Sequence, residues 1–515
     1  MSWDYKETKK RVKDHIASIG KITVEKLKKE ADLETLLSET NCREIYGAHL
    51  YFNIGNFAAL ASAATDNKDE MRRLVQAVHI YQREVTNIVE TSDMFDAVPV
   101  HFQGPKLHAL MYRPIDDGKK LSSRAVLMSM VLRDFVRSVF NPAFPKLGNF
   151  RVASGADIGD VIGTQNGIRG QRELLFLGHP ANYAAKIIGS LGSHRLTRGV
   201  YDLLPQKLKD ACELVPDDDR SLYQTKDLTH DELDALCSEF GVAWDRMKSA
   251  KRIEDDHTQF PLSDIEISDA EVLIDMDLLS IKNNKRIEAA SAFADLSGFT
   301  AYIDAAETDE RQEEALRVLH VVRKEFMMVG TGDYNGVHVQ FQGDRIQLIV
   351  HLPKGREKKV IRKAVDIAAG IQSSMDVIKE CMPEAKNLSV AIGIDHGTTL
   401  LSKLGARGAR DRICLGEAVE HAAMIEERVD GTDSGISSSA HDELAPEIAD
   451  LFTWDNETQC YVATNLKVDV LERADEAAKM NEEKAATVSR SAAGVSVVAG
   501  MGAGRTIAVS RNYGE

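Results

Sequence analysis

Two carboxylates in the second half of the chain are placed where a folded protein can hold a ligand. Asp295 ends the apolar, strand-like run of ASAFADLSGFT, and Asp344 lies in the QGDR turn of a hairpin expected beside that strand. Carboxylates that converge from adjacent strand ends can hold two divalent metal ions, which polarise a phosphate and lower the pKa of an attacking hydroxyl. Singly, Asp344 is also a common type of turn former and Asp295 a common type of helix cap. As a pair they favour a site for two Mn²⁺ or Mg²⁺ ions and phosphoryl chemistry.

Composition limits the class of protein. A chain of 515 residues is long enough for two or three domains. Its 64 basic and 80 acidic side chains give a formal charge of −16, which argues against nucleic acid as a broad-surface partner. An anionic substrate therefore needs local cations or metal ions. No run of about 18 apolar residues occurs, and the start MSWDYKETKK has no apolar core, so we expect no membrane span, no secretory signal and a cytoplasmic protein.

The second half of the chain echoes the first. VPVHFQGPKLHALMYRP (98–114) matches VHVQFQGDRIQLIVHLP (337–353), and residues 150–189 match residues 388–427. Upstream, LYFNIGNFAAL aligns with the opening stretch and puts Asn53 opposite Asp295. Three blocks in the same order, roughly 240 residues apart, indicate a duplicated domain.

Each copy shows the same α+β pattern. In the second copy an apolar strand precedes a long amphipathic helix, predicted over about 298–329, and a hairpin turns at QGD. A helix near 357–381, the strand LSVAIGID, a short hairpin around GARGARDR and a helix that begins at Glu417 follow. Such an order suits sheets with helices on one face. The predicted segments are an N-terminal helical part (1–44), a first domain (45–215), a charged helical connector (216–284), a second domain (285–467) and a helical, then mobile tail (468–515).

The motifs FADLSGFT, the GD turn and LGEAVEHAAMIEE resemble those of the class III nucleotide cyclases. The resemblance spans both copies and is more specific in the second. It implies two tandem ferredoxin-like domains that pair head to tail around an interface site. In that family one domain supplies the metal-binding acids, and the other supplies base readers with an Asn and an Arg that stabilise the transition state. Within one chain this predicts an intramolecular pseudo-heterodimer, and it is compatible with a homodimer of whole chains.

The first copy has lost one half of such a site and kept the other. Asn53 and Pro105 stand where the metal acids belong. The helix LGHPANYAAKI keeps Asn182 at the family's Asn position and has Lys186 at the Arg position. Side chains four residues apart project from one face of a helix, so both can reach the same ligand. The resemblance thus assigns Asn182 and Lys186 as catalytic residues, although Lys lacks the planar fork of Arg and acts as a point charge.

The second copy shows the reverse pattern. It keeps Asp295 and Asp344 but has Glu420 and Met424 at the Asn and Arg positions, where neither side chain suits a triphosphate. The losses are complementary, which predicts one working interface site and one dead site. The alternative is a wholly degenerate, regulatory cyclase fold.

The resemblance places His101 and Leu175 at the two base-reading positions. Neither matches the pair of residues that reads adenine, because Leu175 cannot accept a hydrogen bond from an exocyclic amine, and the acid of the guanine pattern is absent too. In lacking the purine readers, the chain resembles the PycC pyrimidine cyclases of bacterial Pycsar antiphage defence. There, cyclic UMP or cyclic CMP activates a partner effector protein. His101 could donate to uracil O4 or stack on the ring.

The function expected from this resemblance is cyclisation of a pyrimidine nucleoside triphosphate, with UTP ahead of CTP and ATP. The family site implies that two metal ions on Asp295 and Asp344 activate the ribose 3′-hydroxyl. The substrate-binding stretch expected to cradle the β- and γ-phosphates consists of Leu296, Ser297, Gly298, Phe299 and Thr300. The rival hypothesis is a nucleotide-sensing module without catalysis.

Overall fold

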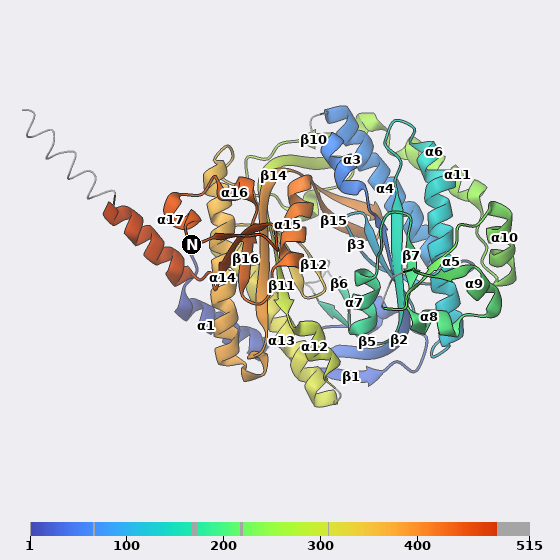
Figure 1. The fold of residues 1–515 in the computed structure, drawn as a ribbon, viewed down its shortest axis with the longest axis horizontal. Coiled ribbons are helices and arrows are strands. Elements are labelled where there is room, and N and C mark those ends of the chain that lie inside the picture. The colour runs from blue at the N-terminus through green and yellow to red at the C-terminus, as the bar shows by residue number, and fades with distance from the viewer. Residues whose placement is uncertain (1, 65–66, 167–172, 217–219, 307, 482–515) are drawn as a thin grey trace, which may run out of the picture.

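Two sheets with matching strand order organise the chain in the computed structural model (Figure 1). The structure describes residues 2–481, apart from 65–66, 167–172, 217–219 and 307. The first sheet runs in the order β3 (Val98–Gln103), β4 (Lys106–Met111), β2 (Asn41–Ile54), β5 (Val152–Asn166), β7 (His194–Leu196), β9 (Tyr223–Thr225) and β8 (Cys212–Leu214), with β1 (Thr23–Lys26) beside β2 and β6 (Glu173–Leu177) beside β5. The second runs in the order β12 (Val337–Gln342), β13 (Arg345–Val350), β11 (Asn283–Ser297), β14 (Ser389–Ala406), β16 (Asp433–Ile436), β18 (Cys460–Thr464) and β17 (Thr453–Asp455), with β10 (Glu266–Ser268) beside β11 and β15 (Ala409–Leu415) beside β14.

The helices repeat in the same way. Those up to the end of the first sheet are α1 (Tyr5–Ser18), α2 (Leu33–Leu36), α3 (Phe57–Ala64), α4 (Lys68–Glu90), α5 (Gly118–Phe135), the π-helix η1 (Val136–Phe140), α6 (Asn141–Ala143), α7 (His179–Lys186), α8 (Arg198–Leu203) and α9 (Gln206–Asp210). Those that follow are α10 (His230–Glu239), α11 (Arg246–Gln259), η2 (Leu262–Asp264), η3 (Met276–Leu278), α12 (Phe299–Asp304), α13 (Asp309–Met328), η4 (Val329–Asp333), α14 (Glu357–Cys381), η5 (Pro383–Ala385), α15 (Glu417–Arg428), α16 (Ser438–His441) and α17 (Pro446–Ala449). The expected α+β architecture of two similar tandem halves is confirmed.

The helix predicted over 298–329 is two helices. Gly298 has a φ of 87°, a left-handed conformation that glycine adopts without strain, and α12 begins directly after it. Thr308 then starts a second helix, because its side chain accepts the backbone N–H of Arg311 as an N-cap of α13. The helices predicted near 357–381 and from Glu417 are α14 and α15.

Each half has its own apolar core. Helices α4 and α5 cover the first sheet, and α13 and α14 cover the second. In α14, Val360, Ile361, Ala364, Val365 and Ala368 are all buried, the spacing of one helical face. Burying a Val or Ile side chain contributes about 1.5–3 kcal/mol, so such a face decides where the helix lies. Among the described helices, none is both long and apolar enough to span a membrane.

The long hairpins of the two halves exchange apolar residues. Ile162, Leu175 and Leu177, from β5 and β6 of the first half, belong to the core of the second half. In return, Leu404 and Ile413, from β14 and β15, belong to the core of the first half. The halves are therefore joined by shared cores, which fixes how their surfaces face one another.

The repeat also includes segments ahead of each sheet. Strand β1 pairs with β2 of the first half, but the preceding α1 packs on α13 and α14 of the second half. Conversely, β10 pairs with β11 of the second half, while the preceding α11 packs on α4 and η1 of the first half. Both helices begin after an aspartate N-cap, Asp4 in α1 and Asp245 in α11. The segment expected as a connector (216–284) thus contains a second copy of the N-terminal arm, and the two arms cross between the halves.

Equivalent polar contacts anchor the two arms. In the first, Arg11 bonds the fully buried carboxylate of Glu325 at 2.6 and 2.8 Å. In the second, Arg252 bonds buried Glu84 at 2.7 and 2.8 Å. Because a buried carboxylate is costly without a partner, each pair strongly favours the docked arm.

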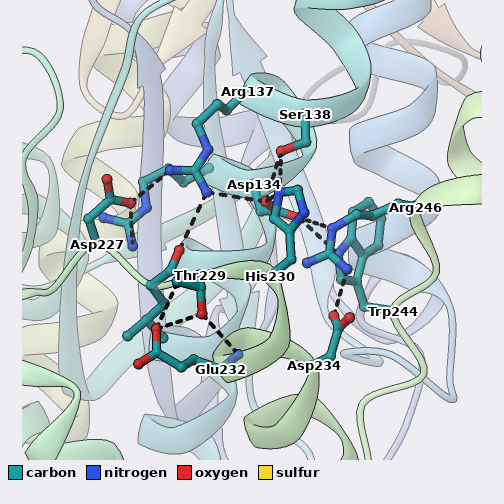
Figure 2. A network of polar contacts seen from close by, with 12 residues as sticks. Asp134, Arg137, Ser138, Asp227, Thr229, His230, Glu232, Asp234, Trp244 and Arg246 are labelled. Atoms are coloured by element: carbon teal, nitrogen blue, oxygen red, sulfur yellow. Dashed lines mark hydrogen bonds and ion pairs between the residues drawn. The ribbon is translucent and has the colours of Figure 1, made fainter.

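The connector also docks through the buried carboxylate of Asp134, at the end of α5 (Figure 2). Asp134 accepts from Arg246 Nε at 2.6 Å, from Trp244 Nε1 at 3.4 Å and from Ser138 Oγ at 3.0 Å. A capping box between Thr229 and Glu232 begins α10 beside this network. Past this connector, residues 468–481 are helical, and the tail predicted over 482–515 lies outside the described residues.

Candidate active site

Helix α7 of the first half meets α12 of the second half. Asn182 donates through Nδ2 to Thr300 Oγ1 at 2.8 Å, and the backbone N–H of His179 donates to Asp304 Oδ1 at 3.0 Å. The structure therefore brings Asn182 against the stretch that follows Asp295.

The two predicted metal acids lie side by side in the second half. Strand β11 pairs with β13 in a register that places Ala294 opposite Ile346, so Asp295 lies next to the β12–β13 turn that carries Asp344. Both side chains are half-buried. Burial raises the pKa of Asp295, and burial together with the charge of Asp295 raises the pKa of Asp344 well above its ordinary value. A divalent cation would relieve this repulsion, which fits the pair to metal binding.

Within the described residues, no group of three or more His, Cys, Asp or Glu side chains is arranged as a metal site. The chain would thus offer two carboxylates, and substrate phosphates and water would complete the coordination, as is usual for Mg²⁺ in nucleotide enzymes.

Two cations flank the acids. Lys186, exposed at the end of α7, and Arg345, next to Asp344, both act to lower the pKa of Asp295. Lys186 therefore lies close enough to act electrostatically on Asp295 across the interface. Arg345 is held by Glu426 of α15, with Nη1 2.8 Å from Oε2. Sequence reasoning missed Arg345 and Glu426, because neither carries a recognised role in the motifs.

The base-reading positions lie in different surroundings. His101, in β3, faces a cavity of about 400 Å³ lined by both halves, with Glu173, Gln340 and Phe341 among its walls. Burial lowers the pKa of His101 to about 4, so its imidazole is neutral near pH 7. Its Nε2 lies 2.8 Å from Gln103 Nε2. Leu175 is buried in the core of the second half and offers no polar group.

The predicted phosphate-binding stretch divides into two kinds of position. Leu296 and Phe299 have buried side chains that pack in the core, so only their backbone could face a phosphate. Ser297 and Thr300 are partly exposed, and Gly298 is exposed at the turn. Thr300 is the one that contacts α7.

The counterpart of the α7–α12 interface lies where α15 of the second half meets α3 of the first half. Ser62 Oγ lies 3.1 Å from Glu417 Oε2, and Met424 is 44% exposed. Lys106 follows Pro105 as the first residue of β4. Burial raises the pKa of Glu420 to about 7, and the charge of Lys106 opposes this rise. The described residues at this position include neither of the paired aspartates found at the first.

Comparison with known proteins agrees with this architecture. Residues 282–472 match the family described as the adenylate and guanylate cyclase catalytic domain. The chain is similar to a uridylate cyclase of Pseudomonas aeruginosa, 29% identical over 470 residues that cover 88% of each protein. A uridylate cyclase of a Rhizobium species is 26% identical over 436 residues, 79% of this chain and 80% of that protein. The crystal structure of a class III adenylyl cyclase-like ATP-binding protein from Pseudomonas aeruginosa has a TM-score of 0.80 and 25% identity, and the match covers 92% of this chain and 100% of that one.

Proposed function

We propose that this chain, a nucleotide cyclase whose second half is a class III cyclase catalytic domain, converts UTP to 3′,5′-cyclic UMP and pyrophosphate. The observation that carries the proposal is the complementarity of the halves. Asp295 and Asp344 come from the second half, whereas Asn182 and Lys186 come from the first half and face them through α7. In the reaction the ribose 3′-oxygen bonds to the α-phosphorus, the bond to the β-phosphate breaks, and the 3′-hydroxyl loses its proton.

Each residue has a role in this proposal. Asp295 and Asp344 would hold two Mn²⁺ or Mg²⁺ ions, which would supply Lewis acidity at the phosphates and at the attacking hydroxyl when bound. Asn182, positioned by Thr300, orients the ribose. Lys186 offsets the negative charge that grows on the phosphorus oxygens in the transition state. The backbone of 296–300 faces the β- and γ-phosphates.

The choice of UTP rests on the base positions and on the relatives. Neutral His101 can donate to a uracil carbonyl, and buried Leu175 cannot pair with an exocyclic amine. Two relatives are named uridylate cyclase, whereas the similar crystal structure is described as ATP-binding. CTP and ATP are therefore the competing substrates. We further propose that the cyclic nucleotide is a second messenger of antiphage defence in the cytoplasm, and that it activates a separate effector protein.

The test is incubation of the purified protein with Mn²⁺ and each of the four ribonucleoside triphosphates, with products identified by mass spectrometry. Cyclic UMP as the main product is the expected result. Cyclic AMP or cyclic CMP as the main product would refute the assignment of UTP and keep the cyclase. Absence of any product, with nucleotide binding intact, would favour the nucleotide-sensing alternative.

Two variants connect the product to the site. Asp295→Asn should abolish turnover while the protein stays folded. Asn53→Asp, at the equivalent position of the first half, should retain turnover, because that position belongs to the other interface.

A further inference from the structure

Arg323, in α13 of the second half, is a buried cation at the interface between the halves. Its side chain is 2% exposed, and Nη2 lies 3.0 Å from Glu173 Oε2 of the first half. The guanidinium carbon lies 3.9 Å from the centre of the Phe341 ring. Burial lowers the pKa of Arg323 to about 10, so the group remains charged near pH 7.

Two donors of this guanidinium have no partner. Among the described residues, nothing accepts a hydrogen bond from Nε or Nη1 of Arg323. A buried charged donor without an acceptor is costly, and native proteins seldom keep one without a reason. The free donors therefore indicate that the acceptor of Arg323 lies outside the described part of the chain, and a bound ligand is the acceptor we consider.

The position of Arg323 indicates which acceptor that is. Its partners Glu173 and Phe341 both line the cavity of about 400 Å³ that His101 also lines. Its charge helps to lower the pKa of His101 and opposes the rise in the pKa of Asp344. The guanidinium therefore acts on both the base-reading position and one of the proposed metal acids, and its partners line the cavity where the base end of a bound nucleotide would be.

The duplicated fold provides an internal comparison. Glu84 and Glu325 are equivalent because each binds the arginine of an arm, and two residues before them lie Gln82 of α4 and Arg323 of α13. Gln82 donates through Nε2 to the carbonyl oxygen of Gly104 at 3.1 Å, within its own half. Of these two equivalent positions, the one that carries a guanidinium belongs to the half that supplies Asp295 and Asp344.

We propose that Arg323 is a specificity-determining residue that donates a hydrogen bond to a carbonyl oxygen of the pyrimidine base. Uracil carries such an oxygen at O2 and O4, and cytosine at O2, whereas adenine has none. Adenine offers only ring-nitrogen acceptors, at other positions than the pyrimidine carbonyl oxygens, so an ATP molecule in this site would lose the carbonyl contact to Arg323 and be selected against. Glu173 and Phe341 position the guanidinium. This inference rests on the proposed cyclase function and names the feature of the substrate that its site selects.

The test compares four full-length variants with the wild type. Arg323→Met removes the donors, and Arg323→Lys keeps the charge without the fork. Glu173→Gln loosens the guanidinium but leaves it in place. Arg317→Met is the matched control, because Arg317 lies on the same helix and donates to Ile19 O, Gly20 O and Glu313. Initial rates with Mn²⁺ are measured for UTP, CTP and ATP, and thermal unfolding checks each fold.

The expected result is a selective loss. In Arg323→Met, kcat/KM for UTP falls at least about tenfold, mainly through KM, and the preference for UTP over ATP falls by the same factor. Arg323→Lys lies between, Glu173→Gln loses a smaller part of the preference because it loosens the guanidinium, and Arg317→Met keeps the wild-type preference for UTP. Where ATP is not turned over, its inhibition constant against UTP replaces the rate. Equal losses for UTP and ATP in Arg323→Met and Arg323→Lys would overturn the inference and leave Arg323 as a structural clamp.

Calorimetric binding of UTP separates this inference from the proposed function. If the wild type forms no product, the cyclase proposal fails, but UTP binding at least about tenfold weaker in Arg323→Met than in Arg317→Met still supports base contact. Equal binding by these two variants would refute it.

Discussion

Removing one of the two paired carboxylates should separate metal binding from folding. Asp344 is the better target, because its pKa is raised by burial and by the neighbouring charge of Asp295. In metal-free buffer at about pH 8, burial and the charge of Asp295 disfavour the charged form of Asp344 in the folded state, so Asp344→Asn should unfold at the same temperature as the wild type or higher. The amide is a poor metal ligand, so the variant should lose the response to Mn²⁺.

The size of that response can be worked out. A ligand that is present at about 100 times its Kd stabilises the folded state by about 2.7 kcal/mol. For a domain of about 200 residues, 1 kcal/mol shifts Tm by about 2–4 °C, so Mn²⁺ with α,β-methylene-UTP should raise the wild-type Tm by about 5–10 °C. Asp344→Asn should show less than about a third of this shift, and its UTP turnover should fall by at least about 10²–10³.

Differential scanning fluorimetry with and without Mn²⁺ and the analogue measures both effects. Asp376→Asn is the control, because Asp376 is half-exposed and pairs with Lys467 on the surface. That variant should keep the full shift. If Asp344→Asn retains the Mn²⁺-dependent shift, or unfolds several degrees below the wild type without metal, Asp344 is structural and the metal assignment is wrong.

Three further predictions test other parts of the structure. Lys186→Ala should lower kcat for UTP by about 10²–10³ with little change in Tm, and Lys186→Arg should restore part of the lost kcat. A loss of kcat below about threefold in steady-state kinetics would remove Lys186 from the mechanism. Arg11→Ala leaves the fully buried Glu325 without its bidentate partner and should lower the free energy of unfolding in urea by about 3–5 kcal/mol. Lys13→Ala, at an exposed position of the same helix, should leave this free energy unchanged. Equal effects of the two variants would show that Arg11 does not anchor the arm. Burial raises the pKa of Asp411 to about 7, so the folded state binds a proton that the unfolded state has released, and stability falls as pH rises from about 4 to 7. Asp411→Asn should flatten this part of the stability–pH curve, and an unchanged slope would contradict the assignment.

Local patterns in the sequence were sufficient for much of the fold. The sequence predicted a helix near 357–381 and another from Glu417, which are α14 and α15, because a helix with one apolar face is specified by residues near one another in the chain. The duplication was also visible, since matched blocks need no knowledge of packing. The predicted helix over 298–329 was wrong in its middle, because the apolar pattern continues through a position where Thr308 instead caps a new helix.

The repeated arms were missed for the same kind of reason. The two arms share only scattered residues, among them Trp3-Asp4 and Trp244-Asp245. A match this short is too weak to indicate a repeat from the sequence alone. Their equivalence becomes clear when Arg11 and Arg252 are seen to bond Glu325 and Glu84 in opposite halves.

For the site, the sequence by itself determined the chemistry available and its division between the copies. Residue types at motif positions require no coordinates, so Asp295, Asp344, Asn182 and Lys186 could be named in advance. Only the tertiary structure decided that α7 faces α12, and that Arg323 meets Glu173, which lines a cavity shared by the two halves. Those contacts join residues that are far apart in the chain, and they depend on the hairpins and arms exchanged between the halves. No local pattern encodes such an exchange, because its free energy comes from burying one half's side chains against the other half.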